Sequence, residues 1–133
     1  MMEPIYHITQ QSAWNAAAGA AAYRGDILDR EGFIHCSTRD QVGATANRYF
    51  RGAHGLALLE IDPEKLAVPL RYERAPEGGL FPHVYGPINR EAVRQVLAFE
   101  PGPDGEFAFP EADSAEAKID GQAAPDRMKR QRT

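Results

Sequence analysis

Short apolar runs alternate with amphipathic stretches along the first half of the chain. Residues 5–8 form a β-rich run, and residues 11–23 repeat aromatic and small apolar side chains at helical spacing. A compact apolar run follows at residues 32–36, and residues 37–51 again keep apolar positions three and four apart. This order predicts a strand, a helix, a second strand and a second helix.

Short strands dominate the pattern of the second half. They are predicted at residues 55–61, 69–73, 80–85 and 93–99. A loop containing Pro76, Gly78 and Gly79 joins the second of these strands to the third, and Asn89 begins a short helix before the last one. Two main helices, with strands that outnumber them and pair late in the chain, predict an α+β fold.

The composition changes near residue 100, and this change predicts one domain followed by a tail. Residues 4–100 carry the tryptophan, all five tyrosines and all four histidines, whereas residues 101–133 are rich in proline, glycine, alanine and charge. Ordering the backbone costs about 1–2 kcal/mol per residue, and so few large apolar side chains cannot offset that cost. We therefore expect a single domain over residues 4–100 and a flexible tail over residues 101–133. Phe107 and Phe109 are expected to pack the start of this tail against the domain surface.

Composition and charge narrow the classes of function. Hydrophobic residues make up 43% of the 133 residues and charged residues 26%, which is typical of a globular chain. The formal net charge of -4 argues against electrostatic binding of nucleic acid over a broad surface. No apolar run approaches the roughly 20 residues that span a bilayer, and the N-terminus lacks the pattern of a secretory signal. We expect a cytoplasmic protein without a membrane role, and the oligomeric state stays open.

Three histidines lie in three separate apolar segments. They are His7 in YHIT, His35 in FIHCST and His83 in FPHVYG. A buried imidazole is stable only where it is hydrogen-bonded, so each of these placements costs stability. Any one of them alone can be a satisfied core residue, whereas three together favour a shared polar cleft. Both interpretations stay open at this point.

Two features near these histidines are able to bind an anion. Ser37 and Thr38 stand at the start of the second predicted helix, where free N–H groups and hydroxyls favour phosphate. Ordinary N-capping explains the same two residues without a ligand. Arg24 follows the first predicted helix, and its guanidinium can clamp a phosphate or carboxylate, or else form a surface ion pair with Asp26 or Asp29.

The single cysteine adds little chemistry. Cys36 excludes an intrachain disulfide and a four-cysteine zinc site. Adjacent His35 points to the opposite face of the same predicted strand, and neither His7 nor His83 has metal-ligand spacing to it, so no metal is expected. We expect Cys36 to be a small buried hydrophobe rather than a nucleophile.

Several of these motifs together resemble a known family. The residues that carry the likeness are Ile5-Tyr6-His7-Ile8-Thr9 with Trp14, Tyr23-Arg24, EGFIHCST at residues 31–38, LLEID at residues 58–62, and LFPHVYGP at residues 80–87. As a set they are similar to the bacterial domain-of-unknown-function family 952 (DUF952), over about residues 4–99. The resemblance to this family implies no particular reaction.

The same segments resemble, in order and local pattern, the ADP-ribosyltransferase fold, which includes poly(ADP-ribose) polymerases and RNA 2′-phosphotransferases. This likeness implies a small split β-sheet core, with NAD or ADP-ribose as the class of cofactor. By the likeness, His7 and Thr9 would contact a ribose and an amide, and His35 would replace an aromatic that stacks on nicotinamide. His83 and Tyr85 would lie on the strand that carries a catalytic glutamate in the transferases.

The chain departs from those transferases at two points. Ile8 replaces a glycine that lets the ligand approach the backbone, and Leu80, Phe81 and Pro82 precede His83 where a glutamate would be expected. A histidine-based site similar to that of the 2′-phosphotransferases is compatible with these departures. An RNA end with a 2′-phosphate is therefore the one nucleic-acid partner that the resemblance suggests.

The leading hypothesis is a cleft for a nucleotide-like or other phosphorylated small molecule. The candidate catalytic residues are His35 and His83, and the candidate ligand-binding residues are His7, Thr9, Arg24, Ser37, Thr38 and Tyr85. If the protein is an enzyme, the resemblance implies a transferase. The alternative is a non-enzymatic partner-binding module in which the histidines are structural core residues.

Overall fold

The computed structural model describes residues 2–110. The helices in this range are α1 (Gln11–Ala16), α2 (Gly25–Glu31) and α3 (Arg39–Tyr49), with short 3-10 turns η1 (Pro63–Lys65) and η2 (Arg90–Ala92). The strands are β1 (Ile5–Gln10), β2 (Ala22–Tyr23), β3 (Ile34–His35), β4 (Ser37–Thr38), β5 (Leu56–Ile61), β6 (Leu70–Arg74), β7 (Leu80–Val84), β8 (Ile88–Asn89) and β9 (Val93–Phe99). This is the α+β class that the sequence predicted.

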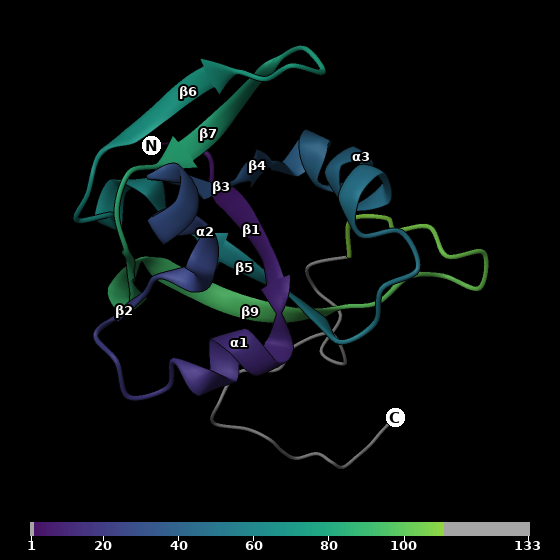
Figure 1. Ribbon diagram of the computed structural model, residues 1–133, viewed down its shortest axis with the longest axis horizontal. Helices are drawn as coiled ribbons and strands as arrows, with labels where there is room; N and C mark the ends of the chain where they lie inside the picture. The colour runs from purple at the N-terminus through teal and green to yellow at the C-terminus, as the bar shows by residue number, and fades with distance from the viewer. Residues whose placement is uncertain (1, 111–133) are drawn as a thin grey trace.

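The strands of the described residues form three antiparallel sheets. The largest has the order β4-β1-β5-β9, a second pairs β2 with β8, and the third has the order β3-β7-β6. Every residue of β5 is buried, which explains why its sequence LALLEI is almost continuously apolar. Figure 1 shows β6 and β7 as a hairpin at one end of the molecule, apart from β5 and β9.

Two hydrophobic clusters pack against the two faces of the largest sheet. Side chains alternate along β1, so Tyr6 and Ile8 join the cluster under α3, whereas Ile5 joins the cluster on the opposite face. Val42 and Ala46 of α3 complete the first of these clusters. His7 and Thr9 alternate in the same way and share the face of Ile5.

The helices differ from the sequence prediction in number and length. The helix expected over residues 11–23 ends at Ala16, because the chain turns through Gly19, with φ at +90°, and returns as β2. The sequence pattern did not predict α2, since only Ile27 and Leu28 of its seven residues pack inward, too few to establish a helical period. The described residues thus contain three α-helices where two main helices were expected.

The segment around Cys36 also differs from the prediction. The single strand expected over residues 32–36 gives way to two short strands, β3 and β4, with Cys36 between them. The cause is a change of neighbour, because β3 pairs with β7 whereas β4 pairs with β1. Ser37 therefore lies in β4, and α3 begins two residues later than its predicted start.

The first part of the chain beyond residue 100 packs against the domain. Phe107 is 5% exposed and belongs to the cluster under α3, where Phe109 also packs. Asn47 binds this segment through both side-chain atoms: its Oδ1 accepts from the Phe107 N–H (2.7 Å), and its Nδ2 donates to the Phe107 carbonyl (3.2 Å). Residues 101–110 are therefore part of the packed structure, and the rest of the predicted tail, residues 111–133, lies outside the described residues.

Gly86 occupies a close approach between two loops. Its φ is +152°, and a Cβ added there would lie 2.6 Å from Cγ1 of Val68. Gly86→Ala is therefore expected to lower the free energy of unfolding by about 2 kcal/mol, through strain and overpacking, as measured by chemical denaturation. The double variant Gly86→Ala/Val68→Ala relieves the clash and should lose less stability than the two single changes together; simple additivity would contradict this explanation.

Candidate functional site

The three histidines of the apolar segments come together at one place. His35 of β3 and His83 of β7 are directly paired across their strands, and their ring centroids lie 5.2 Å apart, edge to face. His7 of β1 joins them because its Nδ1 donates a hydrogen bond to the backbone carbonyl of His35 (2.7 Å). Three segments that are far apart in the sequence thus meet here, through the ring contact of His35 with His83 and the bond from His7 to the His35 backbone.

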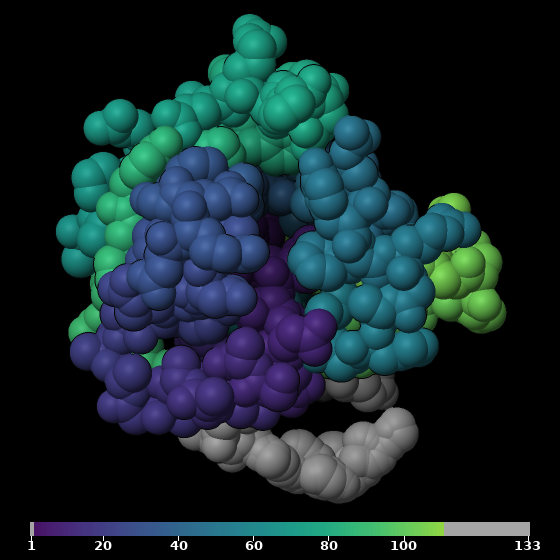
Figure 2. Space-filling view, viewed as in Figure 1, coloured from purple at the N-terminus to yellow at the C-terminus, as the bar shows by residue number. Residues whose placement is uncertain are grey.

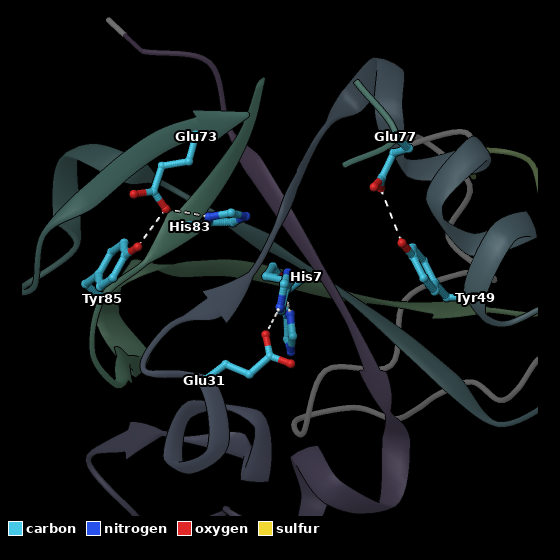
Figure 3. A network of polar contacts seen from close by, with 8 residues as sticks. His7, Glu31, Tyr49, Glu73, Glu77, His83 and Tyr85 are labelled. Carbon is cyan, nitrogen blue, oxygen red and sulfur yellow. Dashed lines mark hydrogen bonds and ion pairs between the residues drawn. The ribbon is translucent and has the colours of Figure 1, made fainter. Parts of the chain in front are cut away.

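A hollow in the surface lies over the strand that carries His7. Figure 2 shows this hollow between α2 and α3, with β1 at its base. β1 pairs with β4 only through Ile5 and Tyr6, so within the described residues no strand covers this edge of β1 from His7 onward. Figure 3 shows His7 and His83 near one another, with the β6–β7 hairpin beside His83. We call this hollow, together with the segments that carry His7, His35 and His83, the histidine groove.

A carboxylate from the neighbouring strand holds His83, as Figure 3 shows. Oε1 of Glu73 accepts hydrogen bonds from His83 Nδ1 (2.7 Å) and from the Tyr85 hydroxyl (2.6 Å). The bond from Tyr85 and then the bond from His83 hold the pKa of Glu73 below its ordinary value. The same contact with Glu73 raises the pKa of Tyr85, so the phenol keeps its proton at neutral pH.

Glu73 is not apparent as a partner of His83 in the sequence, because it is ten positions away along the chain. In the hairpin, Arg71 stands opposite His83 and Glu73 stands opposite Phe81, two residues further along the same face. Diagonal neighbours on one face of an antiparallel pair lie within reach of long side chains. The register of the hairpin across residues 75–79 was therefore the signal that could have identified the acidic partner of His83.

His35 has a carboxylate partner of its own. Its Nε2 lies 2.8 Å from Oε1 of Glu31, the last residue of α2, and the two form an ion pair when the imidazole is protonated. The His35 side chain is 51% exposed, whereas those of the other two histidines of the groove are buried. Phe33 lies among the rings, stacked on His83 with centroids 4.2 Å apart and 4.7 Å from His35. The groove thus has an aromatic wall beside two imidazoles that each contact a carboxylate.

His7 is buried and neutral at pH 7. Burial lowers its pKa from 6.5 to about 4, and this effect outweighs the hydrogen bond to the His35 carbonyl, which raises it. Because a carbonyl only accepts hydrogen bonds, the proton of neutral His7 lies on Nδ1, and Nε2 is an acceptor. Thr9, on the same face of β1, shares a hydrogen bond with the Tyr23 hydroxyl (2.6 Å), and the Tyr23 ring centroid lies 5.7 Å from that of His7.

Ser37 and Thr38 are satisfied without a ligand. Ser37 is buried in β4, where its hydroxyl donates to Oγ1 of Thr45 (3.3 Å). Thr38 is the N-cap of α3, and its N–H donates to the side chain of Gln41 (2.9 Å), as in a capping box. Ordinary capping and pairing therefore account for both residues, and α3 begins after them rather than at Ser37.

The cation nearest the histidines comes from the hairpin rather than from Arg24. Arg24 forms an ion pair with Asp29 on the exposed side of α2. Arg71 follows the alternation of β6 onto the face of Glu73, and its guanidinium carbon lies 5.0 Å from the centre of the Tyr85 ring. Arg71 forms no ion pair with any residue that the structure describes, but its charge contributes to the lowered pKa of Glu73.

The described residues also bear on metal ligands, the cysteine thiol and membrane-spanning helices. No group of three or more His, Cys, Asp or Glu side chains among residues 2–110 has the geometry to hold a metal ion. Cys36 is buried, and burial raises the pKa of its thiol, so the sulfur is protonated at neutral pH. Among the described helices, none has the length and apolar character needed to cross a bilayer.

The fold and the groove define a small α+β protein with a cluster of histidines at a surface hollow. The family described as "Protein of unknown function (DUF952)" matches residues 8–96, and the chain belongs to this family. No curated protein matches the chain. The family resemblance expected from the sequence motifs is thereby confirmed.

Solved structures of one bacterial protein share this fold. The crystal structure of protein CC0527 from Caulobacter crescentus is 31% identical, has a TM-score of 0.72, and the match covers 79% of this chain and 93% of that one. The solution NMR structure of the same protein is 33% identical with a TM-score of 0.70, covering 80% and 92%. Neither structure is described as an ADP-ribosyltransferase, so the comparisons do not support that part of the expected relationship.

Proposed function

We propose that the histidine groove binds a small nucleotide-like ligand that carries hydroxyls and an anionic group, and that His35 and His83 exchange a proton with it. The observation that carries this proposal is the meeting of three histidine-bearing segments at one hollow. Burying two of these imidazoles lowers the stability of a chain of this size, and ligand binding is a functional reason for the fold to retain them.

The hydrogen-bonding groups at the groove favour a ligand with hydroxyl or N–H donors. His7 and His83 are buried residues, and Nε2 of each has no hydrogen-bond partner among the described residues. Buried polar atoms ordinarily have a partner, so each nitrogen is suited to a donor that a ligand brings. The hydroxyls of a sugar supply such donors, and Phe33 offers an apolar surface beside them.

The charges at the groove favour an anion on the same ligand. Arg71 stands beside Glu73 and Tyr85 on the hairpin, free of an ion pair within residues 2–110. A guanidinium of this kind binds phosphate or carboxylate through two parallel hydrogen bonds. A phosphorylated ribose combines hydroxyls with an anion, which is why ADP-ribose, NAD and a 2′-phosphorylated RNA end are the ligands to test first.

The paired imidazoles favour acid–base chemistry in the groove. A histidine changes charge near neutral pH, so one ring can take a proton from the ligand while its neighbour gives one. Glu31 and Glu73 each lie within hydrogen-bond distance of one of the two rings. A transferase acting at a phosphorylated ribose, as the ADP-ribosyltransferase likeness implies, would use this arrangement.

Calorimetric titration and thermal unfolding with ADP-ribose, NAD and a 2′-phosphorylated RNA oligonucleotide test the proposal. We expect saturable heat with at least one of them, together with a rise in melting temperature, because a ligand that binds only the folded state stabilises it. Absence of heat with all three, at unchanged melting temperature, would contradict the proposal and favour the partner-binding alternative.

His35→Ala separates a functional from a structural role. Because its side chain is half exposed, the change is expected to lower the free energy of unfolding by less than about 1 kcal/mol while reducing ligand affinity at least about tenfold. His54→Ala is the matched control, since His54 is an exposed histidine that pairs with Glu100 away from the other three. Unfolding of the His35→Ala variant, or unchanged affinity, would identify His35 as a structural residue.

A further inference from the structure

The contacts of Glu73 determine what His83 can do. We propose that Glu73 is the positioning residue of the histidine groove: it keeps the proton of neutral His83 on Nδ1, so that Nε2 accepts a proton from a ligand hydroxyl. The part of this inference that concerns the ligand rests on the proposed function. The part that concerns the proton of His83 stands on the hairpin alone.

The hydrogen bonds around Glu73 show where the protons lie. Its Oε1 is 2.7 Å from His83 Nδ1 and 2.6 Å from the Tyr85 hydroxyl. Both bonds lower the pKa of Glu73, so this oxygen is a carboxylate acceptor for both groups. His83 must then donate through Nδ1, and a neutral imidazole has only one N–H. The lone pair of neutral His83 is therefore on Nε2.

The ring of His83 is held so that Nε2 points away from Glu73. In Figure 3 the far side of the ring is directed toward the space between the hairpin and α3. The His83 side chain is 10% exposed, and Phe33 stacks on the ring, so the ring has little freedom to turn. Nε2 has no hydrogen-bond partner within the described residues, which marks it as the atom available to a ligand.

The proton transfer that follows is simple. The O–H bond of a ligand hydroxyl breaks, its electron pair stays on the oxygen, and the proton forms an N–H bond with Nε2 of His83. The imidazolium then carries a proton on each nitrogen, and the Glu73 carboxylate stabilises its charge through the bond that it already accepts. When this N–H bond breaks again and the proton returns to the ligand oxygen, neutral His83 is restored.

The tautomer of His83 can be measured by NMR in the ligand-free, full-length chain. Long-range proton–nitrogen spectra at about pH 8, above the ordinary histidine pKa, distinguish Nδ1–H from Nε2–H, and His83→Gln identifies the signals. We expect Nδ1–H in the wild type and a shift toward Nε2–H, the form that free histidine prefers, in Glu73→Ala. The inference would be overturned if the wild type showed Nε2–H, or if the wild type and Glu73→Ala showed the same tautomer. If the variant fails to fold, the wild-type spectrum still shows which nitrogen of His83 carries the proton.

Glu77→Ala is the matched control for Glu73→Ala. Glu77 lies in the loop of the same hairpin and contacts Tyr49 (3.4 Å) instead of a histidine. With ADP-ribose as the probe, we expect Glu77→Ala to bind like the wild type and Glu73→Ala to bind about tenfold more weakly, because Nε2 of His83 no longer accepts. Equal affinity of Glu73→Ala and the wild type would overturn the ligand part. A further outcome is that the wild type binds no probe while His83 still has the expected tautomer. In that case the proposed function fails, together with the inferred role of Nε2 in accepting a proton from a ligand. The positioning of the His83 proton by Glu73 then stands.

Discussion

Phe107→Ala is expected to lower the free energy of unfolding by about 3 kcal/mol. Its ring is buried under α3 and packs against Phe99, with centroids 4.8 Å apart, so truncation removes apolar contacts and leaves a cavity. The backbone of Phe107 is also tied to Asn47, which limits how far the segment can collapse into that cavity. Urea unfolding of the wild type and the variant measures the difference.

A loss of this size would show that residues 101–110 contribute to the stability of the domain. Tyr49→Ala is the control, because this large side chain is 59% exposed and its loss should change stability by less than about 0.5 kcal/mol. A Phe107→Ala variant as stable as Tyr49→Ala would mean that the segment leaves the surface in solution. The single domain would then end near residue 100, as composition alone predicts.

Acid is expected to destabilise the fold through His7. Its pKa is about 4 in the folded chain and 6.5 as the ordinary value, so the unfolded chain binds a proton that the folded chain resists. The contribution of neutral His7 is complete above pH 6.5 and is lost progressively as the pH falls toward 4. At about 1.4 kcal/mol for each pKa unit, the loss amounts to about 3 kcal/mol.

His7→Gln isolates this effect, because glutamine can donate to the His35 carbonyl but does not titrate. Urea unfolding at pH 7 and pH 5 is the measurement, and the wild type should lose more stability than the variant between these values. Glu73 and Glu100 do not confuse the comparison, since their lowered pKa values place their losses at more acidic pH. Parallel losses in the two proteins would show that His7 is protonated in the folded state.

The strands were predictable because their apolar runs are long or regular. β5 is a nearly continuous apolar stretch and begins one residue later than predicted, and β9, which ends in the apolar run VLAF, has the predicted bounds. α2 escaped prediction because a helix of two turns with two inward residues has no period to detect. The split between β3 and β4 escaped it because the pattern of one strand does not say that the chain changes partner halfway.

In the candidate site too, features of neighbouring residues could be predicted from the sequence, whereas contacts between distant elements could not. The three histidines could be singled out because each stands conspicuously in an apolar segment, and the structure brings them together. Their carboxylate partners could not be identified from neighbouring residues, since Glu73 reaches its histidine across a hairpin and Glu31 comes from the unpredicted α2. Arg24 and Ser37 looked suited to an anion in sequence, but nearer partners within the fold engage both of them.

The β6–β7 hairpin places one half of the site in a single short stretch of chain. Glu73 and His83 are ten positions apart, whereas the bond from His7 to the His35 carbonyl joins residues 28 positions apart. The contact between Glu73 and His83 therefore needs only local loop closure, whereas the contact between His7 and His35 needs the whole sheet. In relatives, insertions in the loop at residues 75–79 should therefore leave the bond between Glu73 and His83 intact. Substitutions that disrupt β1 or β3 should instead cost both the meeting of the three histidine segments and the fold.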